Sequence, residues 1–418
     1  MIIPKALADE TAYVRRIAVL ACVKLHQLSP SSVRDTGLID NLYSMIRDSD
    51  PAVVVDCLSA LEEILKDEGG VVINEAMAHY LLRKLNSFPT WSQIRVLDIL
   101  KKYSPSSEDE VFDIMNTADG LLMHNSSTAV AMCLQLFLHL LHNLPHLKCE
   151  VFKRCQSALV SHLGSGNVEL CYAVLSIISK APKEALHHFC SSFQSFFCRN
   201  KDPCYLKLKK LELLPLLITE ENGTVILTEL SLHCLSGSLA VSLGAMRAVG
   251  YVHQHIPFLS GACLEKLGSL MHTSSPHILS NLLQVLQDME ISDSSFWEEL
   301  MSPVSLNFHT ITDSRGKAAI LYLLGEHLRD SEDAFSIIED CTEEFAELED
   351  RDLKIQLLTT ATKMFLAHPF ELQSLLGGLL QVAVGDRDLE VQSRARFLYN
   401  LLESGIDTAK AVLLDVPT

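Results

Sequence analysis

The chain has 418 residues, of which 48% are hydrophobic and 6% aromatic, and its formal net charge is −18 at pH 7. This excess of acid argues against nucleic acid as the main partner, because phosphate binding requires clustered Lys and Arg. A compact fold of this length would divide into two or three domains, whereas a repeat array need not, because each repeat contacts only its neighbours.

Residues 48–66, DSDPAVVVDCLSALEEILK, predict one amphipathic helix. The Asp-Ser-Asp-Pro turn supplies a capping Asp and places Pro51 in the first helical turn. Glu62 and Glu63 lie off the apolar stripe and are expected to face water. The stripe itself consists of residues that recur at helical spacing, namely Val53, Cys57, Leu58, Leu61, Ile64 and Leu65.

The same pattern returns along the chain at intervals of roughly 35–39 residues, which is close to the period of two-helix repeats. Residues 350–368, DRDLKIQLLTTATKMFLAH, repeat it most clearly, and weaker copies start near residues 9, 87, 125, 164, 201, 236, 273, 310 and 386. A second apolar segment in each interval supplies a partner helix, as in residues 38–47 and 370–384. One helix pair cannot bury its own stripe, so neighbouring pairs must stack. The sequence therefore predicts an all-α, HEAT/armadillo-like α-solenoid of about eleven helix pairs, forming a single continuous domain over residues 1–418.

The cysteines and histidines do not form a recognisable metal motif. The twelve cysteines include no C-x-x-C pair, and most lie on apolar stripes, which indicates small buried residues in a reducing compartment. His139, His142 and His146 lack a third ligand tied to them by a motif. The remaining Cys/His cluster matches no zinc module, and it comprises His187, His188, Cys190, Cys198 and Cys204. We predict no metal site in either group.

A search for catalytic motifs is equally negative. The sequence contains no phosphate-binding loop, no G-x-S-x-G and no H-E-x-x-H, so no catalytic or cofactor-binding residue, no cofactor and no enzyme activity are predicted. The pairs Gly69-Gly70 and Gly377-Gly378 are interpreted as helix terminators or close-packing points. Glycosylation patterns at Asn125 and Asn222 stand without a signal-peptide layout. Residues 234–252, the most lipid-like window, predict a buried helix rather than a membrane span.

One basic cluster, RNKDPCYLKLKK at residues 199–210, stands out in this acidic chain. Lys207, Lys209 and Lys210 follow a turn, with Tyr205 beside them. These four residues form a candidate surface for an acidic partner helix or for anionic lipid headgroups. The alternative is a solvated helix face whose aliphatic Lys stems cover the core.

Several stretches, in collinear order over nearly the whole chain, resemble the β-adaptins, which are the large β subunits of vesicle-coat adaptor complexes. They are DETAYVRRIAVLACVKLH, DSDPAVVVDCLSALEEIL, TWSQIRVLDILKKYSP, DPCYLKLKKLELL, SRGKAAILYLLGEH and KIQLLTTATKMFLAHPFE. The run EEILKDEGGVVINEAMAHYLL is most similar to the β subunit of adaptor protein complex 4, whereas the last helix, SRARFLYNLL, departs from the usual family wording.

The resemblance implies a structural, non-enzymatic subunit of a heterotetramer that also contains a medium, a small and a second large adaptor subunit. It implies cargo sorting and intracellular protein transport at the trans-Golgi network, in the cytoplasm, with peripheral membrane association and recruitment by an Arf-type GTPase. It further implies a trunk that lacks the first repeats, with part of the GTPase-facing region, and also the hinge and appendage. Without the resemblance, an α-solenoid nuclear-transport receptor or another protein-binding scaffold remains the alternative.

The amino-terminal segment predicts an exposed apolar surface. Its apolar residues cover more than one helix face, and they are Leu7, Tyr13, Val14, Ile17, Leu20, Val23 and Leu25. Because a single following repeat cannot bury all of them, we expect an apolar patch of the size that marks an interface.

Overall fold

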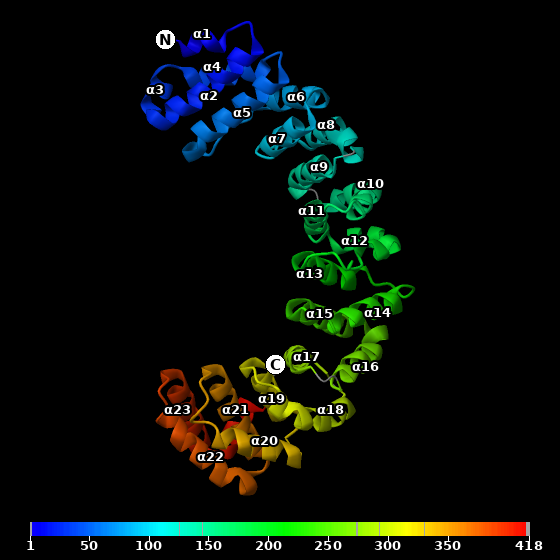
Figure 1. Cartoon of the computed structure of the whole chain (residues 1–418), viewed down its shortest axis with the longest axis vertical. Helices are drawn as coiled ribbons and strands as arrows, with labels where there is room; N and C mark the ends of the chain where they lie inside the picture. The colour runs from blue at the N-terminus through cyan, green and yellow to red at the C-terminus, as the bar shows by residue number, and fades with distance from the viewer. Residues whose placement is uncertain are drawn as a thin grey trace. The chain divides into compact units, whose positions relative to one another are not determined.

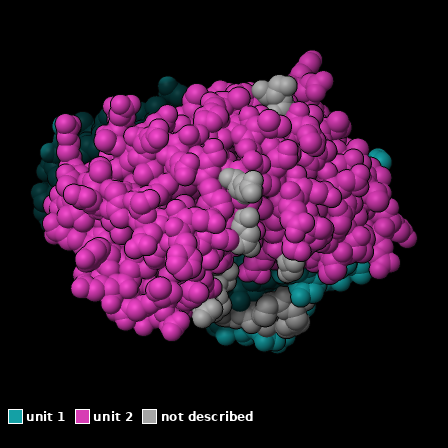
Figure 2. All heavy atoms as spheres, turned by 90° about the horizontal axis from the view of Figure 1, so that it is seen from below, with its two compact units in different colours: residues 1–196 teal, residues 197–418 magenta. Residues whose placement is uncertain are grey.

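The computed structural model describes residues 2–124, 126–143, 145–272, 275–291, 293–329 and 331–414. In these ranges the regular structure is entirely helical, which confirms the predicted all-α class. The chain forms two compact units, Met1–Phe196 and Phe197–Thr418, which Figure 2 distinguishes by colour. Figure 1 shows that the helices of each unit follow one another as neighbours in chain order. That the units behave as one continuous domain stays a prediction.

Unit 1 is a stack of helix pairs. Its first layer consists of α2, α5, α7, α9 and α11, each of which packs on the next, while α6 packs on α8 in a second layer. The α-helices are α1 (Ile3–Leu7), α2 (Ala12–Leu28), α3 (Pro30–Asp35), α4 (Leu38–Ser44), α5 (Pro51–Ile64), α6 (Glu75–Lys84), α7 (Thr90–Leu100), α8 (Glu108–Ala118), α9 (Ser127–Leu140), α10 (Pro145–Leu163), α11 (Val168–Ile178) and α12 (Lys183–Leu186).

Unit 2 repeats this arrangement. Its first layer runs through α13, α15, α17, α19, α21 and α23, and its second layer runs through α16, α18, α20 and α22. Its α-helices are α13 (Cys204–Leu213), α14 (Gly223–Cys234), α15 (Leu239–His255), α16 (Ser260–Leu270), α17 (Pro276–Gln287), α18 (Ser294–Asn307), α19 (Ser314–His327), α20 (Glu332–Glu343), α21 (Arg351–Ala367), α22 (Pro369–Val384), α23 (Leu389–Glu403) and α24 (Ile406–Leu413). Every predicted repeat start lies just before a first-layer helix, so the predicted solenoid is confirmed.

The Asp-x-Asp turn before α5 joins two repeats. Asp50 caps α5, since its Oδ1 accepts a hydrogen bond from the Ala52 N–H at 2.8 Å. Asp48 Oδ1 accepts from the Asp50 N–H, also at 2.8 Å. Arg15 of α2 holds both carboxylate oxygens of Asp48 with two 2.8 Å hydrogen bonds. The second Asp therefore starts the helix, and the first binds a cation of the preceding repeat.

The turn before α23 is built in the same way. Asp388 Oδ1 accepts from the Glu390 N–H at 2.8 Å, and Asp386 Oδ1 accepts from the Asp388 N–H at 2.9 Å. Lys354 of α21 donates to Asp386 Oδ2 at 2.6 Å, in an ion pair about nine-tenths buried on both sides. The two junctions lie in different units, yet they share one design.

The predicted stripes form the core, with one correction. Leu58 and Leu358 are fully buried, at 0% exposure. Glu63 is exposed as expected, but Glu62 is half-buried. Its carboxylate accepts hydrogen bonds from the Val71 N–H at 3.2 Å and from Lys102 Nζ. The prediction that Glu62 faces water was wrong, because Val71 of the following loop and Lys102 of the next repeat both bind its carboxylate.

The glycine pairs differ from one another. Gly69 and Gly70 have φ values of +96° and +83° and end the helical turn after α5, as predicted. Gly377 and Gly378 lie in the middle of α22, and a Cβ at either position would meet nothing within 4 Å. They are therefore neither terminators nor close-packing points.

Most of the cysteines are buried, as predicted: Cys22, Cys57, Cys133, Cys155, Cys171, Cys234, Cys263 and Cys341. Among the described helices, none has the length and hydrophobicity to span a bilayer. Asn222 is buried, and its side chain donates to the Leu217 carbonyl at 3.0 Å, so it is a poor glycan acceptor. Asn125 lies outside the described residues.

The apolar surface predicted near the amino end is present only in part on α2, because Val14, Val23 and Leu25 are half-buried. Tyr13, Ile17 and Leu20 are 70%, 48% and 54% exposed, and their i, i+4, i+7 spacing places them on one helix face. Leu7 does not belong to this surface, because it is 5% exposed and α1 packs on α2. We call Tyr13, Ile17 and Leu20 the α2 patch.

Candidate functional site: an apolar groove between α22 and α23

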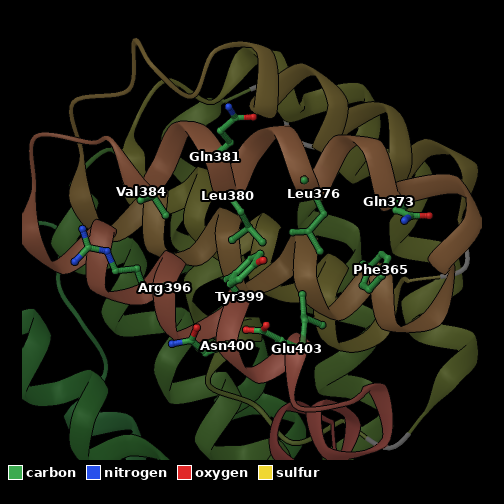
Figure 3. Close-up of a pocket in the computed structure, with 12 residues that line it drawn as sticks. Phe365, Gln373, Leu376, Leu380, Gln381, Val384, Arg396, Tyr399, Asn400 and Glu403 are labelled. Carbon is green, nitrogen blue, oxygen red and sulfur yellow. The ribbon is translucent and has the colours of Figure 1, made fainter.

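A groove of about 880 Å³ opens between α22 and α23 in unit 2 (Figure 3). Six residues of α22 line it, at spacings that place them on one face of the helix: Gln373, Leu376, Gly377, Leu380, Gln381 and Val384. This face extends over about 16 Å, since eleven residues separate its ends and each contributes a rise of about 1.5 Å. The groove is therefore as long as about three turns of helix.

The floor of the groove is apolar and its edges carry amides. Leu376 and Leu380 are almost fully buried, whereas Tyr399 of α23 is 56% exposed. In Figure 3 the side chains of Leu380 and Tyr399 point toward one another. Gln381 and Asn400 also line the groove and are exposed, so their amides can bond to a peptide backbone. An apolar floor with a few polar groups is typical of a binding groove.

Gly377 determines the depth of this groove. It lines the groove from the middle of α22, and a Cβ there would project into open space. Gly378 follows at once on the same helix but does not line the groove. Both positions are thus glycines in the middle of one helix, but only a side chain added at 377 would point into the groove.

Two charges stand at the groove on α23. Arg396 and Glu403 are seven residues apart, which is two helical turns. Arg396 Nη2 donates to Gln392 Oε1 at 3.4 Å. In the part of the chain that the structure describes, neither residue takes part in an ion pair. The groove suits an amphipathic segment of another protein, and its residues form no catalytic constellation.

The predicted basic surface on α13 is smaller than expected. Tyr205 is 42% exposed and Lys207 is half-buried, while Lys209 contacts Glu212 Oε1 at 2.9 Å. That Tyr205, Lys207 and Lys209 bind a partner or lipid stays a prediction.

Lys210 does not belong to that surface, contrary to the prediction. It is 1% exposed, and its Nζ donates to Asp202 Oδ2 at 2.7 Å and to the Phe197 carbonyl at 3.0 Å. Its side chain ties the loop before α13 to the core. The sequence carried a signal for this, because Lys210 shares the buried stripe of Leu206 and Leu213 at i, i+4, i+7 spacing.

Two phenylalanines beside the Cys/His cluster, Phe189 and Phe196, are fully buried. Phe189 meets Phe152 and Phe196 edge to face, at ring-centroid distances of 6.5 and 6.2 Å. His139 and His142 are exposed, and the side chain of His146 lies outside the described residues.

A different group escaped the sequence search. Among the described residues, Glu75, His79 and Glu110 are the one set of three or more potential metal ligands whose ligand atoms converge, all within 4.8 Å of one another. Glu75 and His79 are four residues apart on α6, a spacing that places both on one helix face. Glu110 comes from α8, so its approach depends on the stacking of two repeats.

The fold defines a class of protein: an α-solenoid of stacked helix pairs. The chain belongs to the adaptin family, because the family model described as "Adaptin N terminal region" matches residues 1–406.

Known relatives agree with this assignment. The chain is 36% identical to mouse AP-4 complex subunit beta-1 over 408 residues, which cover 97% of this chain and 55% of the relative. It is 29% identical to beta-adaptin-like protein A of Arabidopsis thaliana over 419 residues, covering 97% and 50%. It is 28% identical to human AP-1 complex subunit beta-1 over 421 residues, covering 98% and 44%. The chain thus spans about half the length of the curated relatives it matches.

Known three-dimensional structures share the fold. A homology model of the full-length AP-3 complex in an intermediate open conformation has a TM-score of 0.61 at 18% identity, covering 96% of this chain and 75% of that one. The crystal structure of a Kap121p mutant has a TM-score of 0.54 at 12% identity, covering 99% and 46%. The α-solenoid alone therefore does not separate the adaptor interpretation from its alternative, whereas the family match does.

Proposed function

We propose that this protein is a structural, non-enzymatic subunit of a heterotetrameric vesicle-coat adaptor complex. The match of the adaptin family model to residues 1–406 carries the proposal. The partners would be a medium, a small and a second large adaptor subunit. The similarity to mouse AP-4 complex subunit beta-1 favours the AP-4 type and action in the cytoplasm at the trans-Golgi network.

Membrane association would be peripheral and would depend on the assembled complex. Recruitment by an Arf-type GTPase belongs to this proposal, as does the absence of nucleic acid among the partners, which the net charge of −18 supports. An α-solenoid nuclear-transport receptor is the less favoured alternative, because it does not account for the family match.

We further propose that the groove between α22 and α23 is one contact for a partner subunit. A partner bound in the groove would cover its apolar floor and the exposed Tyr399. Stable protein interfaces depend on aromatic and aliphatic area that is buried in this way. The amides of Gln381 and Asn400 would satisfy polar groups of the bound segment.

Co-expression with candidate partners tests the subunit role. The full chain, carrying an affinity tag, is produced with the medium, small and second large subunits of the AP-4 complex. We expect all three to be captured in equal amounts. Capture of none of them by a folded chain would overturn the proposed function.

A matched pair of variants tests the groove. Gly377→Leu fills it, and Gly378→Leu adds the same side chain to the same helix outside the lining. We expect Gly377→Leu to lower partner capture at least tenfold and Gly378→Leu to leave it unchanged. Equal capture by both variants would exclude the groove as a contact while leaving the subunit role intact.

A further inference from the structure

Glu110 is the centre of an unusual polar cluster between α6 and α8. It is 8% exposed, and its Oε1 accepts a hydrogen bond from the Tyr103 hydroxyl. Its Oε2 accepts from the Ser106 N–H at 2.8 Å and from the Ser106 hydroxyl at 3.1 Å. These three hydrogen bonds fix the orientation of the Glu110 carboxylate.

The distance from His79 to Glu110 is that of an ion pair and is longer than a strong hydrogen bond. His79 Nε2 lies 3.4 Å from Glu110 Oε1, whereas a charge-assisted N–H···O bond is about 2.7–2.9 Å long. Two ligands bonded to one tetrahedral Zn²⁺ at about 2.0–2.1 Å lie about 3.3 Å apart. The two atoms are therefore about as far apart as two ligands of one tetrahedral ion.

Glu75 adds a second carboxylate with no cation to match it. It is exposed on α6, and its ligand atom lies within 4.8 Å of those of His79 and Glu110. Within the described residues, no Lys or Arg forms an ion pair with Glu75 or Glu110. Two converging carboxylates beside one imidazole leave an excess of negative charge, which a divalent cation would neutralise.

We propose that Glu75, His79 and Glu110 form a zinc site that joins α6 to α8. One imidazole nitrogen and two carboxylate oxygens are ligands that Zn²⁺ accepts, and water completes the coordination. Tyr103 and Ser106 act as the outer partners that hold the Glu110 carboxylate in place. Because the ligands come from neighbouring repeats, the ion would strengthen the junction between them.

Calorimetric titration of the full chain with ZnCl₂ tests the site. The protein is treated with chelator, dialysed and kept reduced, and every sample carries Cys204→Ser because Cys204 is the exposed cysteine. We expect one saturable equivalent of zinc and a higher thermal midpoint when zinc is present, since an ion that binds only the folded state stabilises it. Absence of a saturable equivalent would overturn the proposal.

Substitutions at the proposed ligands test whether the zinc ion binds to these residues. Glu75→Gln and His79→Ala change exposed or half-buried side chains and should fold, yet each should lose the equivalent or weaken it at least tenfold. His233→Ala is the matched control, because His233 also faces a Glu on its own helix, with Nε2 3.1 Å from Glu229 Oε1, but belongs to no converging set. Zinc binding that survives both Glu75→Gln and His79→Ala, or that His233→Ala abolishes, would show that the ion lies elsewhere.

Discussion

Single Asp residues locate the repeat boundaries in this chain. Asp48 and Asp386 each accept a hydrogen bond from the backbone N–H two residues later in the chain. Each also forms an ion pair with a basic residue of the preceding first-layer helix. The helix starts could be read from the sequence because capping is local. The cation partners could not, since Arg15 and Lys354 precede their Asp by 33 and 32 residues. Only the stacking of repeats brings them together.

The Asp386 junction predicts a specific pH dependence. The backbone N–H of Asp388 and the Lys354 ammonium lower the pKa of Asp386. A lowered folded-state pKa contributes stability that is present above the unfolded value of about 3.9 and is lost as pH falls through the folded value. Asp386→Asn should therefore cost about 3 kcal/mol at pH 7, because Lys354 stays buried without its counter-charge, and the difference should shrink below about pH 4.

Denaturant unfolding at several pH values measures this difference. Asp388→Asn is the control, because Asn is as good an N-cap as Asp and this residue receives no buried cation. A constant gap between wild type and Asp386→Asn from pH 7 to pH 3 would contradict the assigned role.

At the level of the helix, starts were predicted better than side-chain environments. Caps such as Asp50 and Asp350 placed α5 and α21 within a few residues. The burial of Lys210 was missed, although its position on the stripe indicated it. The convergence of Glu75, His79 and Glu110 could not be predicted, since it needs the relative placement of α6 and α8. The groove had no local signal except the glycine pair in α22.

Substituting Ala for Gly378 and for Gly70 should change the stability of the protein in opposite directions. Gly378 is an exposed helical residue with open space at its Cβ position, so Gly378→Ala should stabilise the protein by about 0.5–1 kcal/mol through helix propensity. Gly70 has φ +83°, and a Cβ there would collide with Glu62 and Lys102. Gly70→Ala should therefore destabilise the protein. Thermal melts of the two variants compare these effects directly, and a shift of the same sign in both would refute the argument.

At the scale of the whole molecule, exposed apolar surface should determine whether the isolated chain associates with itself. The α2 patch, Tyr13, Ile17 and Leu20, is contiguous along one helix face. Contiguous exposed patches on soluble proteins usually mark interfaces. The isolated chain should therefore associate unless a partner covers this face.

Light scattering after gel filtration tests this expectation. The double variant Ile17→Lys with Leu20→Glu removes apolar surface without entering the core, and it should reduce association at least several-fold at equal protein concentration. Lys24→Glu, on an exposed residue of the same helix, is the control for a change in charge. A strictly monomeric wild-type chain would contradict the prediction.

The Asp-x-Asp junctions also bear on how such a chain yields to mechanical load. A force that draws neighbouring repeats apart meets two kinds of contact. Apolar side chains can slide past one another and lose their contacts gradually, whereas the hydrogen bonds of an ion pair hold only over a narrow range of distance and angle. The Arg15–Asp48 and Lys354–Asp386 pairs should therefore resist extension until they rupture abruptly, whereas the apolar contacts around them give way gradually. Under tension, first-layer neighbours joined by such a pair should part in one abrupt event, so a pulling experiment on wild type and Asp386→Asn would register that event as a force peak that the variant lacks.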